Sequence, residues 1–160
     1  MPTGDVSVLP FQVAQYRFAL PIDQVRRVDA IVEPAPLPGA PDPVIGLVSV
    51  HGDAVPLVDL RQRLRAPEQG LRRSDHMILT HDGEREIALR VDTVEPVVVI
   101  AADAISPPTA ASTELPHIQG VGTTTGGLLL IYDLAQCLAP EERDMLADAL
   151  AARDHDPSAG

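Results

Sequence analysis

The stretch GLVSVHGDAVPLVDLRQRL, residues 46–64, contains two apolar runs of strand length and a charged cluster, Asp-Leu-Arg, after the second run. Gly52 separates the two runs, and glycine accepts the positive φ that a tight turn between strands requires. Asp59 follows the second run and stands three residues before Gln62, which is the spacing of a capping box at the start of a helical turn. The stretch therefore predicts a strand, a tight turn, a second strand and a short helical turn.

The same pattern recurs 74 residues further along the chain, where DLRQRL is matched by DLAQCL. The matched pairs are Gly46 with Gly120, Gly52 with Gly126, and Asp59 with Asp133. A second pair of segments, FALPIDQVRRV at 18–28 and IALRVDTVEPV at 87–97, shares one pattern of apolar, Ala, Leu, Asp and Val positions at an offset of 69. This agreement in order and spacing predicts a duplicated unit of about 60 to 70 residues, and hence two small barrels of similar plan.

Most other apolar residues also fall in short runs rich in Val, Ile and Leu with turn-forming residues between them, which predicts an all-β barrel or sandwich. Two Pro-containing segments, 33–43 and 102–116, are predicted to be loops, because proline removes a backbone donor from a central strand or a helix interior. A helix is predicted at the C-terminus, where Pro140 suits the first helical position and the apolar residues that follow share one face.

The 160-residue chain carries 12 Lys and Arg against 23 Asp and Glu, which gives a net charge of -11. This charge opposes binding to nucleic acid or to an acidic membrane surface. No apolar window reaches the roughly 18 to 20 residues that span a bilayer. Cys137 is the single cysteine, and the N-terminus lacks a basic start followed by a long apolar stretch. We therefore expect a cytoplasmic protein that binds no nucleic acid and does not insert into a membrane.

No constellation of residues in the sequence predicts catalysis or metal binding. His76 and His81 are five residues apart on a predicted strand, so they face opposite sides, and no H-E-x-x-H motif or cysteine pair accompanies them. Asp92 lies in VDTV, but its counterpart Asp23 lacks the Gly turn and the hydroxyl residue of an aspartic protease. The Gly-rich segment 120–127 precedes a predicted strand rather than the helix of a phosphate-binding loop. The sequence thus predicts no catalytic residue, metal or cofactor, and favours a binding module.

The stretch at 46–64 resembles the signature of CheW-type coupling proteins of bacterial chemosensory arrays, typically Gly-x-x-Asn-x-Arg-Gly-x-x-x-Pro-x-x-Asp-Leu-Arg. The resemblance continues in RFALPIDQVRRV, EIALRVDTVEPVV, ISPP, HIQGVGTTTGGLLLIYDLAQCL and APEE, and it covers roughly residues 6–150. It implies an all-β fold of two intertwined five-stranded SH3-like barrels around a shared core, with short helical turns and a C-terminal helix. The expected parts of the chain are a tail at 1–5, a CheW-like domain at 6–139 with barrel halves at roughly 6–64 and 75–138, and a helix and tail at 140–160.

The resemblance also implies a function. Members of this family are non-catalytic adaptors, so we expect a chain that joins the cytoplasmic hairpin tip of a chemoreceptor to the regulatory domain of a CheA-type histidine kinase at receptor arrays. In the family the receptor helix packs in an apolar groove between the barrels, while barrel edges and loops contact the kinase, which makes 105–115 a candidate kinase contact. The positions that match the receptor groove are Ile22, Val25, Arg27, Gly46, Val48, His51 and Gly52.

Three positions depart from the family pattern. The family's usual Asn and Arg before the second Gly are Ser49 and His51, and Arg27 stands where an acidic residue is common. If the last two positions pair as acid and arginine in the family, Arg27 and His51 cannot form the same salt bridge, and we expect an altered receptor preference. Two alternatives stay open, namely a scaffold of a non-motility pathway that controls pili or a second messenger, and a small-ligand-binding or enzymatic double barrel.

Overall fold

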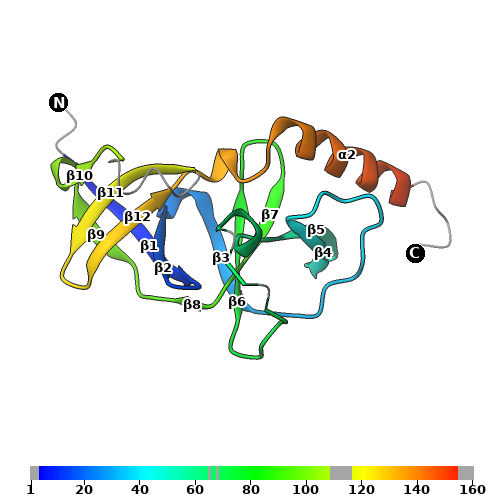
Figure 1. Ribbon diagram of the computed structural model, residues 1–160, viewed down its shortest axis with the longest axis horizontal. Helices are drawn as coiled ribbons and strands as arrows, with labels where there is room; N and C mark the ends of the chain where they lie inside the picture. The colour runs from blue at the N-terminus through cyan, green and yellow to red at the C-terminus, as the bar shows by residue number, and fades with distance from the viewer. Residues whose placement is uncertain (1–3, 65, 68, 109–116, 155–160) are drawn as a thin grey trace.

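The computed structural model describes residues 4–64, 66–67, 69–108 and 117–154. Strands dominate it and form two sheets that lie side by side, with one long helix above them (Figure 1). We name the sheets barrel A and barrel B. The all-β fold predicted from the sequence is confirmed.

Barrel A has the strand order β10-β11-β12-β2-β1-β8, with β9 also paired to β1. Its strands are β1 (Asp5–Val13), β2 (Tyr16–Pro21), β8 (Thr93–Val94), β9 (Val98–Ala101), β10 (Ile105–Ser106), β11 (Ile118–Thr124) and β12 (Gly127–Tyr132). Because β8 and β9 both pair with β1, they act as one strand that is interrupted at 95–97.

Barrel B has the order β3-β6-β7-β5-β4. Its strands are β3 (Val25–Ala30), β4 (Val44–Val50), β5 (Asp53–Asp59), β6 (His76–His81) and β7 (Glu86–Val91). The chain that leaves β3 then bridges to the opposite edge of the sheet, where Ala35 pairs with Leu47 of β4. In barrel A the chain that leaves β9 reaches the opposite edge in the same way, because β10 pairs with the edge strand β11. With β8 and β9 counted as one strand and β10 as the counterpart of the Ala35 bridge, each barrel has the five strands that were expected.

Each barrel contains strands from both halves of the sequence. A parallel pair joins β12 to β2 in barrel A, and another joins β5 to β7 in barrel B. In the described part of the chain the backbone crosses between the barrels twice. The first crossing runs from β2 through the short helix η1 (Ile22–Gln24) to β3, and the second runs from β7 through Asp92 to β8. The two barrels are therefore intertwined, as predicted.

Matching glycines lie at matching irregularities in the two barrels. The register shifts at Gly46 where β4 pairs with β5, and at Gly120 where β11 pairs with β12. A Cβ on Gly46 would lie 2.5 Å from the carbonyl oxygen of Ala35, and one on Gly120 would lie 2.9 Å from Cγ2 of Ile105. Glycine is needed at both positions because the chain that closes each barrel passes directly over it.

The turn glycines match less closely. Gly52 has a φ of 88°, as the prediction of a tight turn requires. In the matching turn the positive φ, 110°, belongs to Gly127 instead of Gly126. Gly126 makes room for the guanidinium of Arg17, because a Cβ there would lie 3.0 Å from Nη1 of that arginine. Arg17 also pairs with Glu95 at 2.8 Å, so it fastens the β11–β12 turn to the interruption between β8 and β9.

The core is shared between the barrels. The largest cluster of buried apolar side chains combines strands of both barrels, and in it the rings of Phe18 and Tyr132 meet edge to face with centroids 5.8 Å apart. A smaller cluster inside barrel B contains Val48, and another inside barrel A contains Leu129. This continuous packing positions the two barrels against each other.

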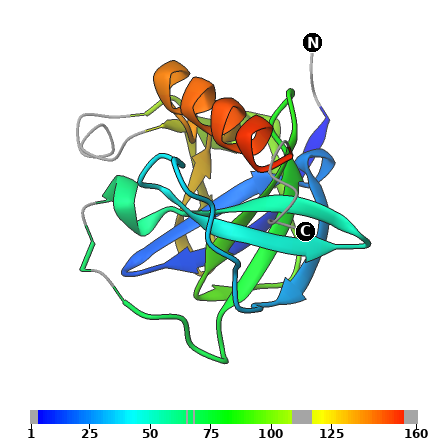
Figure 2. The same cartoon turned by 90° about the vertical axis from the view of Figure 1, so that its right-hand side faces the viewer.

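Helix α2 (Pro140–Asp154) lies above barrel B and inserts Leu146 into the shared core (Figures 1 and 2). Its first turn is held by Glu142, whose carboxylate accepts the N–H of Ala139 at 2.8 Å and pairs with Arg63. Arg143 donates to the buried carboxylate of Asp82 in the β6–β7 turn at 2.6 Å. None of the helices in the described part of the chain has the length and apolar character needed to cross a membrane.

Candidate functional site

Three of the predicted groove residues, Ile22, Val25 and Arg27, lie at the first crossing between the barrels. Ile22 lies in η1 with 40% of its surface exposed. Val25 begins β3 and is half-buried against the shared core. Val28 on β3 and Val32 just beyond it are also exposed. We call these four residues, together with Arg27, the β3 surface. These exposed aliphatic side chains along one segment make the β3 surface a candidate for contact with another protein.

Two predicted residues support this region from inside barrel B. Val48 is only 2% exposed and packs with Leu57 and Met77. Gly46 is buried beneath the closing chain at Ala35. Neither residue has a side chain at the protein surface, whereas Ser49 beside them on β4 is exposed.

His51 and Gly52 form the tip of the β4–β5 hairpin. Val50 pairs with Asp53, so His51 and Gly52 are the two central residues of the turn, with φ values of 50° and 88°. A turn with two positive φ values matches the twist of the strands that it connects. The structure thus explains Gly52 by its backbone conformation, and His51 is exposed at the tip of the hairpin.

The hairpin tip contacts the β3 surface. Nε2 of His51 meets Nη1 of Arg27, so the two departures from the family pattern lie next to each other. Arg27 also makes two bonds to Asp29, each 2.8 Å long, from Nε and Nη2 to the two carboxylate oxygens. The acidic partner in this region is therefore Asp29, which the sequence interpretation missed. Its signal was its position two residues after Arg27, because residues two apart share one face of a strand and the register of β3 is regular from Arg27 onward.

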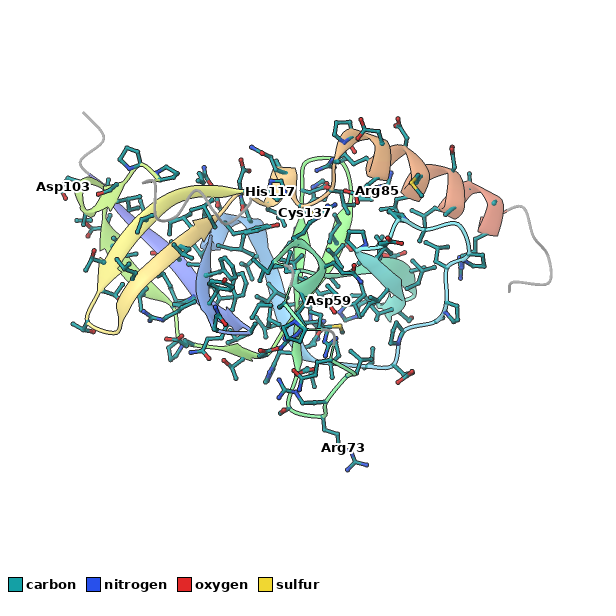
Figure 3. The ribbon with its side chains drawn as sticks, in the orientation of Figure 1. Asp59, Arg73, Arg85, Asp103, His117 and Cys137 are labelled. Carbon is teal, nitrogen blue, oxygen red and sulfur yellow. The ribbon has the colours of Figure 1, made fainter. Side chains whose placement is uncertain are left out.

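A buried ion network lies at the junction of the barrels, and Figure 3 shows Asp59 near the middle of the molecule. Nη1 of Arg90 donates to Asp59 at 3.0 Å, and its Nη2 donates to Asp75 at 3.0 Å. All three side chains are at most 8% exposed. The other oxygen of Asp59 accepts the N–H of Arg61 at 3.0 Å, so the predicted helix cap is present at the start of α1 (Arg61–Leu64). The counterpart Asp133 makes no such cap.

Arg61 extends this network toward barrel A. Its Nη2 donates to both carboxylate oxygens of Asp92 at 2.7 Å. Asp92 in turn accepts the N–H of Ala14, in the β1–β2 turn, at 2.8 Å. Sequence reasoning found Asp59 and Asp92 as strand-end residues but missed both arginine partners.

The candidate nucleophile and the candidate metal ligands lie in different elements. Cys137 is fully buried near the start of α2, and burial raises the pKa of its thiol to about 12, so the reactive thiolate is suppressed (Figure 3). His76 and His81 occupy the two ends of β6. Among the residues that the structure describes, there is no group of three or more His, Cys, Asp or Glu side chains placed to hold a metal ion.

A second apolar surface lies on barrel A. A groove of about 610 Å³ is lined by β9, by Ala104 and by Thr123–Thr125 at the β11–β12 turn, and Val99 in it is 62% exposed. The suggested kinase-contact segment, 105–115, begins nearby as β10, but its residues 109–115 lie outside the described part of the chain.

Comparison with known proteins gives one consistent answer. The family model described as "CheW-like domain" matches residues 7–142. The chemotaxis protein CheW of Rhizobium meliloti (strain 1021) is 27% identical over 149 residues, which cover 90% of this chain and 94% of that protein. The chemotaxis protein CheW of Klebsiella aerogenes is 24% identical over 138 residues, covering 84% and 82% of the two chains. The crystal structure of the scaffolding protein TtCheW from Thermoanaerobacter tengcongensis superposes with a TM-score of 0.81 at 23% identity, over 89% of this chain and 99% of that one.

Proposed function

This chain belongs to the CheW-like domain family, and from that premise we propose that it is a non-catalytic adaptor which couples the cytoplasmic hairpin tip of a chemoreceptor to a CheA-type histidine kinase. The observation that carries this proposal is the exposed apolar β3 surface at the crossing between the barrels. An amphipathic helix binds such a surface by laying its apolar face against it. The receptor tip, a helical hairpin, is a partner of that kind.

An adaptor needs a second surface that stays accessible when the first is occupied. The groove beside β9 meets this need, because Val99 is exposed and β9 lies in barrel A, away from β3 (Figure 1). We assign the kinase contact to this groove. An adaptor with two separate surfaces would hold the receptor tip and the kinase at the same time, in a set relative position.

Two reciprocal substitutions test the assignment. Ile22→Glu is expected to weaken binding of a receptor-tip peptide by at least about tenfold, because it places a charge on an apolar contact, while leaving kinase binding intact. Val99→Glu is expected to do the reverse. Both side chains are well exposed, so the melting temperature should stay close to that of the parent protein. Calorimetric titration with each partner measures the effects.

The matched pair makes the result decisive. If both variants bind both partners as the parent does, the two surfaces are wrongly assigned. If the folded parent protein binds neither partner, the adaptor function itself is wrong. Ile22 is a better test site than Val25, which the sequence alone would select, because Val25 is half-buried against the shared core.

Receptor choice is expected to depend on the contact between Arg27 and His51. The double substitution Arg27→Glu with His51→Arg restores the acid and arginine that the family resemblance leads us to expect at these positions. It should change the ratio of affinities for two different receptor tips by about five- to tenfold, because a charge reversal at a contact site repels one partner while attracting another. Affinities for a panel of receptor-tip peptides measure this ratio. Indistinguishable affinity profiles for the parent and the double variant would show that these residues do not set partner choice.

A further inference from the structure

The second crossing between the barrels is fastened to barrel A through Asp92. This residue follows β7 of barrel B and precedes β8 of barrel A. Its N–H donates to the carbonyl of Gln12 at 2.8 Å, and its carboxylate accepts the N–H of Ala14 at 2.8 Å. Ala14 has a φ of 56°, in the left-handed region, and lies in the tight turn between β1 and β2. Asp92 thus holds the hairpin of barrel A by two hydrogen bonds.

The same carboxylate is held from barrel B. Arg61, which follows β5, donates from Nη2 to both oxygens of Asp92 at 2.7 Å, and its side chain is 8% exposed. Arg72 approaches to 3.5 Å from the segment before β6. The 2.7 Å contact between Arg61 and Asp92 is charge-assisted and largely shielded from water, so it is stronger than a neutral hydrogen bond. Asp92 is therefore a link between the main chain of one barrel and a guanidinium of the other.

The link is anchored deeper in barrel B. The N–H of Arg61 is bound by Asp59, which is paired with the buried Arg90, which is paired with the fully buried Asp75. Arginine and aspartate alternate along this chain of contacts, so the charges compensate one another. Because Asp59 holds the backbone N–H of Arg61, the main chain from which the guanidinium reaches Asp92 is anchored in barrel B.

The repeat gives a comparison within the molecule. Asp23 occupies the position that matches Asp92, 69 residues earlier, and it lies in η1 at the first crossing. Asp23 is exposed there, beside the exposed Ile22, whereas Asp92 is partly buried within the ion network. The two crossings therefore differ. The first, at Asp23, is exposed, and the second, at Asp92, is bound to Arg61.

We infer that Asp92 and Arg61 are positioning residues that fix the angle between the two barrels and, through it, the shape of the partner-binding surface at the first crossing. The β3 surface begins at Ile22 on the crossing segment itself, so its shape depends on how the two barrels are set, and a surface that is formed beforehand binds more tightly. The affinity part of this inference rests on the proposed function, whereas the angle between the barrels does not.

The test replaces Asp92 with asparagine, which keeps an acceptor for Ala14 but removes the charge that faces Arg61. The matched control is Asp82→Asn, which removes a buried carboxylate from the pair with Arg143, between α2 and the β6–β7 turn. Spin labels on Ala54→Cys of barrel B and Leu128→Cys of barrel A, both exposed, report the distance between the barrels. The native Cys137 is buried and its thiol pKa is raised to about 12, so it stays unlabelled.

Asp92→Asn is expected to broaden or shift the distance distribution measured by pulsed electron spin resonance and to lower receptor-tip affinity about tenfold. Asp82→Asn is expected to lower the melting temperature without changing either quantity. If Asp92→Asn does not fold, Arg61→Lys is used, which keeps the charge but loses the contact to both oxygens. An unchanged distribution in the folded Asp92 or Arg61 variant, or equal broadening in the Asp82 control, overturns the inference. If the parent protein binds no receptor tip, the proposed function fails and the distances still decide the inference.

Discussion

Replacing Arg90 with glutamine is expected to lower the free energy of unfolding by about 3 to 5 kcal/mol, because removing one member of a buried ion pair leaves the other charges uncompensated. Arg90 is 4% exposed and lies between the carboxylates of Asp59 and Asp75. Without its guanidinium, two buried carboxylates remain in the same region with less compensation. Urea denaturation followed by circular dichroism measures the change.

Arg73→Gln is the matched control, since Arg73 is exposed and points away from the molecule (Figure 3). Its effect should stay within about 0.5 kcal/mol, as is usual for surface substitutions. A loss below about 1 kcal/mol for Arg90→Gln would mean that water reaches Asp59 and Asp75 and that the network does not stabilise the fold.

Val58→Glu is expected to abolish cooperative folding. Val58 is fully buried in β5, where it pairs with the fully buried Leu89 of β7 across a parallel ladder. An ionised carboxylate in this apolar core has no described cation beside it, and its desolvation exceeds what a domain with a stability of roughly 5 to 15 kcal/mol can absorb. The expected result is the loss of dispersed amide signals in the NMR spectrum and of the unfolding transition.

Ala54→Glu tests the same chemistry on the same strand. Ala54 is exposed, so its substitution should leave the spectrum and the melting temperature nearly unchanged. A folded, cooperative Val58→Glu variant would contradict the placement of β5 in the shared core.

Much of the fold could be predicted because the local signals repeat. Gly46 and Gly120 were matched by spacing alone, and both lie where the closing chain passes over a bulge. The hairpin turn at Gly52 and the start of α2 at Pro140 were also found from local residue preferences. Such features depend on a few neighbouring residues, so one sequence is enough to show them.

Strand β3 was not among the predicted apolar runs. Its sequence, VRRVDA, lacks simple alternation, and the register shift between Val25 and Arg27 explains why, since a bulge sets two residues against one. The candidate site was found only through the family resemblance, and the contact between Arg27 and His51 depends on how barrel B curls.

The ion network could not be predicted from local patterns. Arg90 reaches Asp59, which is 31 residues away in the chain, because β5 and β7 are parallel neighbours. Arg61 reaches Asp92 over the same separation. Strand order determines which side chains form such ion pairs, and hydrophobic periodicity does not reveal strand order.

Because the barrels exchange strands, they are completed in a fixed order while the chain is made at the ribosome. Barrel B has all its strands once residue 91 has been made, whereas barrel A lacks β12, the parallel neighbour of β2, until residue 132. By residue 101 the strands β8 and β9 can pair with β1, but the other edge of the hairpin, on β2, has no partner before β12 is made, and such edges invite pairing with other chains. The N-terminal strands are thus the first to be made and among the last to be completed.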